Sequence, residues 1–256
     1  MNIVSEEGYQ YYESKGDGEV LLLLHGLMGS LSNFTSLINR FKDRFNVVLP
    51  ILPIFDLPLK KTGLGGLLDY VEGFVKLKGF QNINVLGNSL GGHLSQLVVF
   101  RNPDLYHSMT LTGSSGLFEN TMGNTFPRRG DYEYIDTKTR LTFYDPDSIV
   151  TKEMVDEIYE IVNNKEKAIR LVITAKTAIR HNVEDRLPNV TCPTLLVWGA
   201  DDTITPPFVA EKFDEKIQNS ELHFIPECGH APMMEKPEAF NDILEAFLNR
   251  VTVESA

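Results

Sequence analysis

Continuous hydrophobic runs alternate with helical patterns along the first part of the chain. The runs end sharply at small or polar residues, which is typical of strands that are buried on both faces. Between them, hydrophobic residues recur every three or four positions and indicate amphipathic helices. Strand and helix in strict alternation predict a parallel sheet with helices on both faces. The predicted strands are residues 20–24, 46–49, 83–86 and 108–111, and the predicted helices are 33–45, 67–77 and 90–100.

The same alternation returns at the end of the chain, after a segment of different character. Residues 194–198 and 222–225 are predicted strands, and residues 237–250 form an amphipathic closing helix. The intervening segment has no convincing buried strand and instead shows helical patterns over 151–162 and 165–179. We therefore predict a core domain in two parts, residues 1–116 and 188–256, with a helical cap inserted at residues 117–187.

A G-x-S-x-G motif, with Gly87, Ser89 and Gly91, joins a predicted strand to a predicted helix. A serine on such a sharp turn has a strained backbone and presents its hydroxyl above the sheet. Neighbouring backbone crowds the turn, so the positions two before and two after the serine must lack bulk. Both positions are glycine, and we predict that Ser89 is a catalytic nucleophile.

A serine hydroxyl becomes a good nucleophile only when a base takes its proton. Among the six histidines of the chain, His230 is the predicted base because it lies in the loop after the strand 222–225. The carboxylate that orients it is expected after the strand 194–198. Asp202 is the preferred residue there, and Asp201 is the alternative. The chain order is then nucleophile, acid, base.

The loop that follows the first buried strand, residues 25–29, is expected to complete the site. A tetrahedral intermediate carries an oxyanion, which two fixed N–H donors stabilise best. We predict the backbone N–H groups of Leu27 and Leu90 as these donors, with Met28 as the second choice in the loop. Met28 and Asn88 are also predicted to contact the substrate. His25 is expected to hydrogen-bond loop backbone in a structural role.

Taken in order, the segments HG, GNSLGG, WGADDTITP and CGHAPMMEKPEAF resemble those of the α/β-hydrolase superfamily over essentially the whole chain. The resemblance implies an α/β fold with a mostly parallel, eight-stranded sheet, helices on both faces and an inserted cap. It also implies a triad of Ser89, Asp202 and His230 and hydrolysis through an acyl-serine intermediate. The first expectation is therefore a serine hydrolase that acts on a small or medium carboxylic ester, thioester or lactone.

Two alternatives to ester hydrolysis stay open. The GNSLGG turn and residues 143–153 are similar to the meta-cleavage C–C bond hydrolases, which cleave 2-hydroxy-6-oxo-dienoates. The chain departs from those enzymes after His230, where Ala231 and Pro232 stand in place of a Trp. A ligand receptor on a retained hydrolase fold is the third reading. Arg128 and Arg129 are candidates for binding a substrate carboxylate, but a solvent-exposed role is favoured.

Composition narrows the class of partner. The 256 residues carry a formal net charge of −11, with 24 basic and 35 acidic side chains, so a basic face for nucleic acid or anionic lipid is not expected. The two cysteines, Cys192 and Cys228, suit free thiols rather than a metal site. We expect a cytoplasmic protein that binds a small-molecule substrate without metal, cofactor, nucleic acid or membrane. A homodimer is left open.

Overall fold

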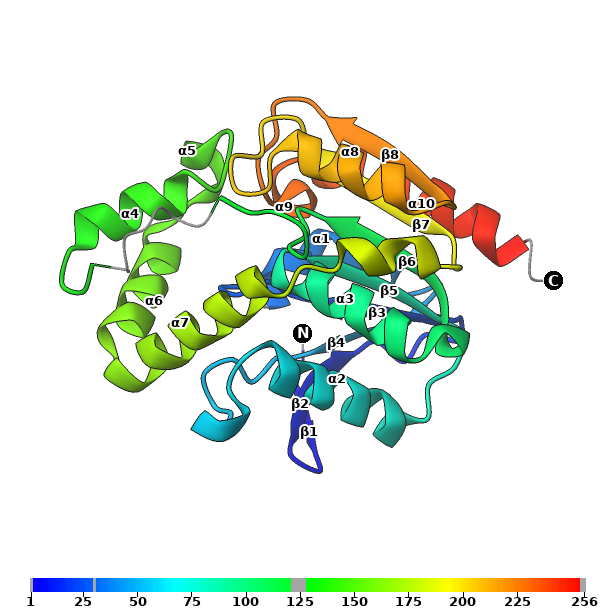
Figure 1. The fold of residues 1–256 in the computed structure, drawn as a ribbon, viewed down its shortest axis with the longest axis horizontal. Coiled ribbons are helices and arrows are strands. Elements are labelled where there is room, and N and C mark those ends of the chain that lie inside the picture. Colours follow the sequence, from blue (N-terminus) through cyan, green and yellow to red (C-terminus); the bar gives the residue numbers. More distant parts are fainter. Residues whose placement is uncertain (1, 30, 121–127, 254–256) are drawn as a thin grey trace.

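The computed structural model describes residues 2–29, 31–120 and 128–253. Its centre is an eight-stranded sheet in the order β1-β2-β4-β3-β5-β6-β7-β8 (Figure 1). Strand β2 pairs antiparallel with both β1 and β4, and every other pairing is parallel. The sheet therefore agrees with the predicted mostly parallel α/β-hydrolase fold. The strands are β1 Val4–Glu6, β2 Tyr9–Glu13, β3 Val20–Leu24, β4 Asn46–Pro50, β5 Ile83–Asn88, β6 Tyr106–Thr112, β7 Thr194–Gly199 and β8 Ser220–Ile225.

Helices cover both faces of the sheet because successive strand side chains point to opposite sides. In β3, Leu22 and Leu24 join one hydrophobic cluster, whereas Leu21 and Leu23 join the other. The first cluster includes side chains of α2 Leu64–Lys78, α3 Leu90–Arg101 and α8 Pro207–Lys216. The second includes side chains of α1 Thr35–Phe41, the short α9 Pro232–Glu235 and α10 Pro237–Val253. Short 3-10 helices lie at Leu31–Phe34, Leu59–Lys61, Pro103–Leu105 and Glu184–Asn189.

Between β6 and β7, the described residues form four α-helices that extend away from the sheet (Figure 1). They have a small hydrophobic cluster of their own, to which Ile135, Val155 and Leu171 belong. Leu27 and Met28, from the loop after β3, pack against this cluster. The helical segment therefore meets the loops at the carboxyl end of the parallel strands. The four helices are α4 Tyr132–Arg140, α5 Pro146–Ile149, α6 Lys152–Asn163 and α7 Lys165–Arg180.

Several described elements lie outside the predicted ones, among them the β1–β2 hairpin and the helices α4, α5, α8 and α9. The hairpin β1–β2 turns at Glu7 and Gly8, both with positive φ (46° and 86°), as a tight hairpin with a two-residue turn requires. Its strands are short and partly exposed, so they lack the buried hydrophobic run that marks the central strands. Helix α4 was also not predicted, because only Ile135 and Thr139 of its residues are buried.

The packing of α10 against the sheet predicts the effect of a core truncation. Phe240 is fully buried, whereas Phe208 on α8 is 51% exposed. Phe240→Ala is expected to lower the free energy of unfolding by about 3–5 kcal/mol, because it removes a buried ring and leaves a cavity. Phe208→Ala is the matched control, with an expected change of about 0.5 kcal/mol or less. Chemical denaturation of both variants measures the difference, and equal losses would contradict this packing.

Candidate active site

Ser89 lies on the turn between β5 and α3. Its backbone has φ 56° and ψ −119°, a conformation that is strained for a residue with a side chain. The turn is tied to the neighbouring strand, since the N–H of Ser89 donates to the carbonyl of Thr112 at 3.1 Å. Asn88 and Leu90 are buried but Ser89 is only partly so, which leaves its side chain open to a reactant.

Glycines on either side of Ser89 make this turn sterically feasible. A Cβ atom on Gly87 would overlap the carbonyl group of Gly91, and one on Gly91 would overlap the carbonyl oxygen of Leu24. On the loop after β3, a Cβ atom on Gly26 would lie 3.2 Å from the Cβ of Ser89. The backbone of three segments therefore converges on the serine with no room for side chains.

His230 and Asp202 form a buried pair. Nδ1 of His230 lies 2.9 Å from Oδ2 of Asp202, and the side chains are 9% and 0% exposed. The carboxylate is held by three further donors, the N–H groups of Ile204 and Thr205 and the hydroxyl of Thr205, at 2.8–2.9 Å. Asp201, the sequence alternative, is exposed. The structure therefore pairs His230 with the preferred acid.

Asn88 connects the histidine loop to the nucleophile turn. Its Nδ2 donates to the carbonyls of Thr112 and His230, at 3.0 and 3.1 Å. Beside it, a Cβ atom on Gly113 would lie 2.9 Å from Nδ1 of His230, which places the imidazole against the end of β6. The predicted substrate contact is not supported for Asn88, because its side chain is buried and both N–H bonds point to backbone.

The loop after β3 places the predicted oxyanion donors. The N–H of Gly29 donates to the carbonyl of Gly26 at 3.0 Å, so Leu27 and Met28 occupy the centre of a tight turn beside Ser89. Leu90 is the first residue of α3, and the N–H groups of a helix's first turn have no acceptor within the helix. Both predicted donors thus lie on segments that adjoin the serine.

His25 has the structural role that the sequence analysis expected. Its Nδ1 lies 2.9 Å from the carbonyl of Gly26, and its Nε2 accepts the N–H of Leu52 at 2.9 Å. Complete burial lowers the pKa of His25 to about 4, so the ring is neutral and can accept that bond. The residue thus fixes the loop after β3 against the loop after β4.

The charge environment of His230 favours its protonated form. Burial acts to lower the pKa of the imidazole, and the charge and hydrogen bond of Asp202 act to raise it. The carboxylates of Glu119 and Glu235 add to the effect, and the pKa lies above its ordinary value. An imidazolium formed during catalysis is therefore stabilised where it stands.

The other histidines and the two arginine candidates have different partners. His93 is buried on α3, with Nε2 3.1 Å from Nδ1 of His181. His223 is exposed on β8 beside Glu221. Arg128 is exposed and stacks on a tyrosine ring, and Arg129 donates to a backbone carbonyl of α6. The favoured solvent-exposed role of the arginines agrees with these contacts.

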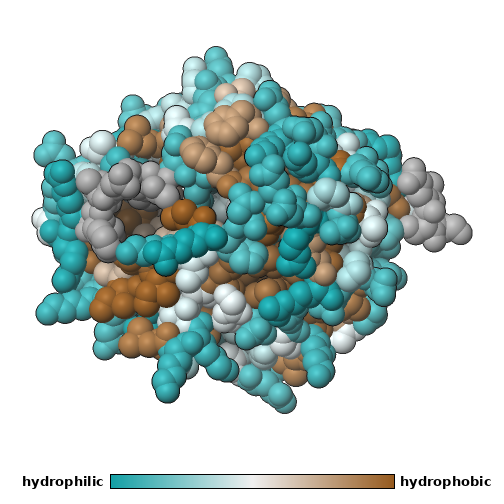
Figure 2. Space-filling model, viewed as in Figure 1, coloured by the Kyte–Doolittle hydropathy of each residue, from teal (hydrophilic) through white to brown (hydrophobic). Residues whose placement is uncertain are grey.

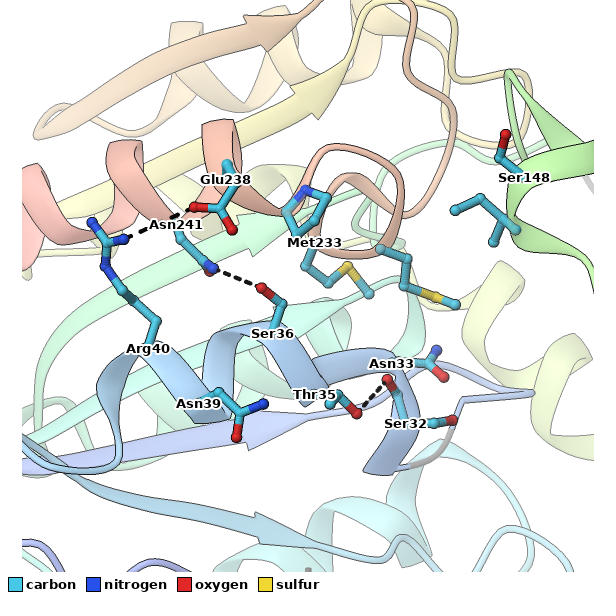
Figure 3. A pocket seen from close by; sticks show the side chains of 13 residues that line it. Ser32, Asn33, Thr35, Ser36, Asn39, Arg40, Ser148, Met233, Glu238 and Asn241 are labelled. Carbon is cyan, nitrogen blue, oxygen red and sulfur yellow. Dashed lines mark hydrogen bonds and ion pairs between the residues drawn. The ribbon is translucent and has the colours of Figure 1, made fainter.

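A groove of about 670 Å³ lies between α1 and the start of α10, beside the site but distinct from it. Figure 3 shows that polar side chains form most of its walls, and Nδ2 of Asn241 donates to the hydroxyl of Ser36 across it at 3.0 Å. Ser148 and Ile149 of the inserted helices lie at one end. None of the three triad candidates lines this groove.

Within the described ranges the chain has neither a metal-binding cluster nor a membrane-spanning helix. No group of three or more His, Cys, Asp or Glu side chains is arranged to hold a metal ion there. Within the same ranges, no helix has the length and hydrophobicity needed to span a membrane. Cys192 and Cys228 are both free and buried.

Comparison with known proteins agrees with the fold. Residues 21–243 match the alpha/beta hydrolase family. The chain belongs to this family. It is 37% identical to an alpha/beta hydrolase enzyme from the sediment metagenome of the Mar Chica lagoon in Morocco. That crystal structure superposes with a TM-score of 0.80 and covers 98% of this chain and 99% of its own.

Named relatives within the alpha/beta hydrolase family are more distant. The chain is 27% identical to 2-hydroxy-6-oxo-6-phenylhexa-2,4-dienoate hydrolase of Comamonas testosteroni, over 94% of this chain and 91% of the relative. The meta-cleavage product hydrolase of Pseudomonas fluorescens has a TM-score of 0.83, with 98% of both chains covered, but only 20% identity. The second likeness shows the fold alone.

Several residues of this hydrolase site were not found from sequence. The hydroxyl of Thr205 bonds Asp202 and lies 3.4 Å from Nδ1 of His230. The hydroxyl of Ser115 donates to Glu119 at 2.6 Å, and the N–H of Ser115 donates to the carbonyl of Ser89. Thr205 stands three residues after Asp202, which is a short-range signal that was available. The position of Ser115 depends on contacts between distant parts of the chain.

The pairing of His230 with Asp202 predicts unequal effects of two neighbouring substitutions. Asp202→Asn is expected to lower kcat by about 10⁴-fold, because the amide cannot stabilise the imidazolium and can favour the wrong tautomer. Asp201→Asn is the matched control and is expected to change kcat by less than about threefold, since surface side chains contribute little. Steady-state kinetics on one ester substrate compare them. A larger loss in the Asp201 variant would contradict the observed pairing.

The raised pKa of His230 predicts the pH below which kcat/KM decreases. If the neutral imidazole is the predicted base, kcat/KM should rise with pH through a single ionisation and level off above it. Because the pKa is raised, the midpoint should lie above the ordinary histidine value of about 6.5. A pH profile of kcat/KM measures this midpoint, and one below 6 would contradict the charge environment described.

Proposed function

We propose that the chain is a serine hydrolase that cleaves a small or medium carboxylic ester, thioester or lactone through an acyl-serine intermediate. The observation that carries the proposal is the buried pair of His230 and Asp202, with Nδ1 and Oδ2 2.9 Å apart, tied by Asn88 to the turn of Ser89. A buried histidine–carboxylate pair beside a partly exposed serine on a strained turn is the arrangement that acyl transfer requires.

The proposed reaction has two stages, acylation of Ser89 and hydrolysis of the acyl-serine. The Oγ of Ser89 forms a bond to the carbonyl carbon while its proton passes to Nε2 of His230, and the N–H groups of Leu27 and Leu90 bind the oxyanion. The bond to the leaving group then breaks, and His230 returns the proton to the departing alcohol or thiol. Water, deprotonated by His230, attacks the acyl-serine, and the carboxylic acid leaves as Ser89 regains its proton.

The surroundings of the site favour an uncharged acyl group. Leu27, Met28 and Phe55 pack against the hydrophobic cluster of the inserted helices. Figure 2 shows hydrophobic residues among hydrophilic ones at the end of the molecule where the inserted helices lie. The Glu119 carboxylate acts on the charge of His230, so a second negative charge near the imidazole would be repelled. These features suit a neutral ester better than an anionic dienoate.

Hydrolysis of a C–C bond is the second candidate, favoured by the named relatives. The Comamonas testosteroni relative is a dienoate hydrolase by name, at 27% identity. Such a reaction first ketonises the dienol and gains from a cation near the substrate carboxylate. Arg170 on α7 is a mostly buried cation near this end of the molecule, but its Nε donates to the carbonyl of Leu57, and its Nη1 lies 3.6 Å from Glu166. Its charge is thus already partnered.

A fluorophosphonate probe tests the nucleophile. The wild-type protein is expected to be labelled on Ser89 and to hydrolyse short-chain nitrophenyl esters. Ser89→Ala should abolish labelling and lower kcat by about 10⁴-fold or more, because only binding and the oxyanion donors remain. Retention of about a tenth of the activity in a folded Ser89→Ala variant would contradict the assignment.

A comparison of kcat/KM on two substrates decides between ester and C–C cleavage. We expect a short-chain nitrophenyl ester to be turned over faster than a 2-hydroxy-6-oxo-dienoate. The triad serves both reactions, so the ratio reports the pocket rather than the triad. A dienoate preference of about 100-fold, or roughly 2.7 kcal/mol of transition-state binding, would make C–C hydrolysis the function.

A further inference from the structure

The inserted helices are bonded directly to the loop of the catalytic-base candidate. Thr142 lies in the connection between α4 and α5, and its carbonyl accepts the N–H of His230 at 2.9 Å. A Cβ atom on Gly229 would lie 2.7 Å from that same carbonyl oxygen and 3.0 Å from Cα of Phe143. The two backbones therefore touch at the residue before the histidine, where only glycine fits.

The carboxylate of Glu235 spans the same junction. Its Oε2 accepts the N–H of Tyr144 at 2.8 Å, and its Oε1 accepts the N–H of Gly229 at 2.9 Å. One oxygen thus bonds the connection between α4 and α5, and the other bonds the residue before His230. Burial raises the pKa of Glu235, while the N–H groups of Tyr144, Gly229, Ala231 and Asp145 counteract the rise by stabilising the charged form.

We propose that Glu235 is a positioning residue through which the seating of the inserted helices sets the placement of the His230 imidazole. This role of Glu235 rests on the proposed function, in which His230 is the base. A substrate that contacts the helical segment would shift Tyr144 relative to Gly229, and Glu235 would pass that shift to the histidine loop. The segment then acts on the chemistry as well as on the shape of the pocket.

Glu235 also acts on His230 by charge, and this provides a distinctive readout. The carboxylates that raise the pKa of the imidazole are those of Asp202, Glu119 and Glu235. Replacing Glu235 by a neutral side chain should therefore lower the pKa of His230. A residue that only supported the fold would leave this pKa where it is.

The first test compares Glu235→Gln with the wild-type protein. The NH₂ group of glutamine cannot accept a hydrogen bond, so the bond from the N–H of either Tyr144 or Gly229 is lost. Fluorophosphonate labelling of Ser89 is expected to slow by about tenfold or more, since a small misplacement of a catalytic group can cost about 100-fold. NMR titration should show the His230 pKa displaced to lower pH. Glu238→Gln is the matched control, because the Glu238 side chain is 82% exposed and its nearest cation is 4.0 Å away.

The second variant, Gly229→Ala, disturbs the junction without a change of charge. Labelling should slow while the His230 pKa stays near the wild-type value, and thermal melting should show both variants folded. Unchanged labelling in either variant, or slowed labelling in Glu235→Gln with an unmoved His230 titration, would overturn the proposal. If the wild-type protein itself fails to label, the proposed function falls. The NMR titration then still tests the effect of the Glu235 charge on the pKa of His230.

Discussion

The close backbone approach around Ser89 is the constraint on which the rest of the structure depends. The serine has a positive φ, a conformation that costs on the order of 1–3 kcal/mol and persists only where surrounding structure enforces it. Here the enforcement comes from β3, β5 and β6, whose ends meet at the turn, and from Gly87 and Gly91, which leave space for the neighbouring carbonyls. The strained conformation of Ser89 therefore depends on the order of the strands in the sheet. Moving β3 or β6 would remove the contacts that hold the strained residue.

Electrostatics at the same edge of the sheet follow from burial. Asp202 is fully enclosed and satisfied by donors from Ile204, Thr205 and His230, so its charge is directed at the imidazole. A buried carboxylate without such partners would be costly, and the loop after β7 supplies them within three residues. The rise in the pKa of His230 is the measurable sign of this arrangement. The same interactions that stabilise the imidazolium also make His230 easier to protonate. An enzyme that uses it as a base would therefore lose activity at low pH.

Substrate choice depends on a different part of the molecule. The triad candidates lie on the turn and loops that follow strands of the sheet, whereas the inserted helices pack against the loop of Leu27 and Met28. Ester and C–C hydrolysis use the same triad. They differ in the substrate pocket that they need, since a dienoate carries a negative charge. The negative charge of Glu119 and the bond of Arg170 to the carbonyl of Leu57 are the observations on which our proposal of a neutral substrate rests. The named relatives do not decide between ester and C–C hydrolysis, because membership of a fold family does not fix the substrate.

The sequence by itself determined the central strands, the turn at Ser89 and the choice of Asp202 and His230 as the pair beside it. These features depend on local causes: continuous hydrophobic runs, small residues at a sharp turn, and loops at the ends of parallel strands. Tertiary structure alone decided what joins them. The Asn88 side chain bonds the carbonyl of His230 across 142 positions, and Glu235 bonds Tyr144 across 91. No local pattern marks an asparagine or a glutamate for such a partner, because the partner comes near only when the sheet and the inserted helices are assembled.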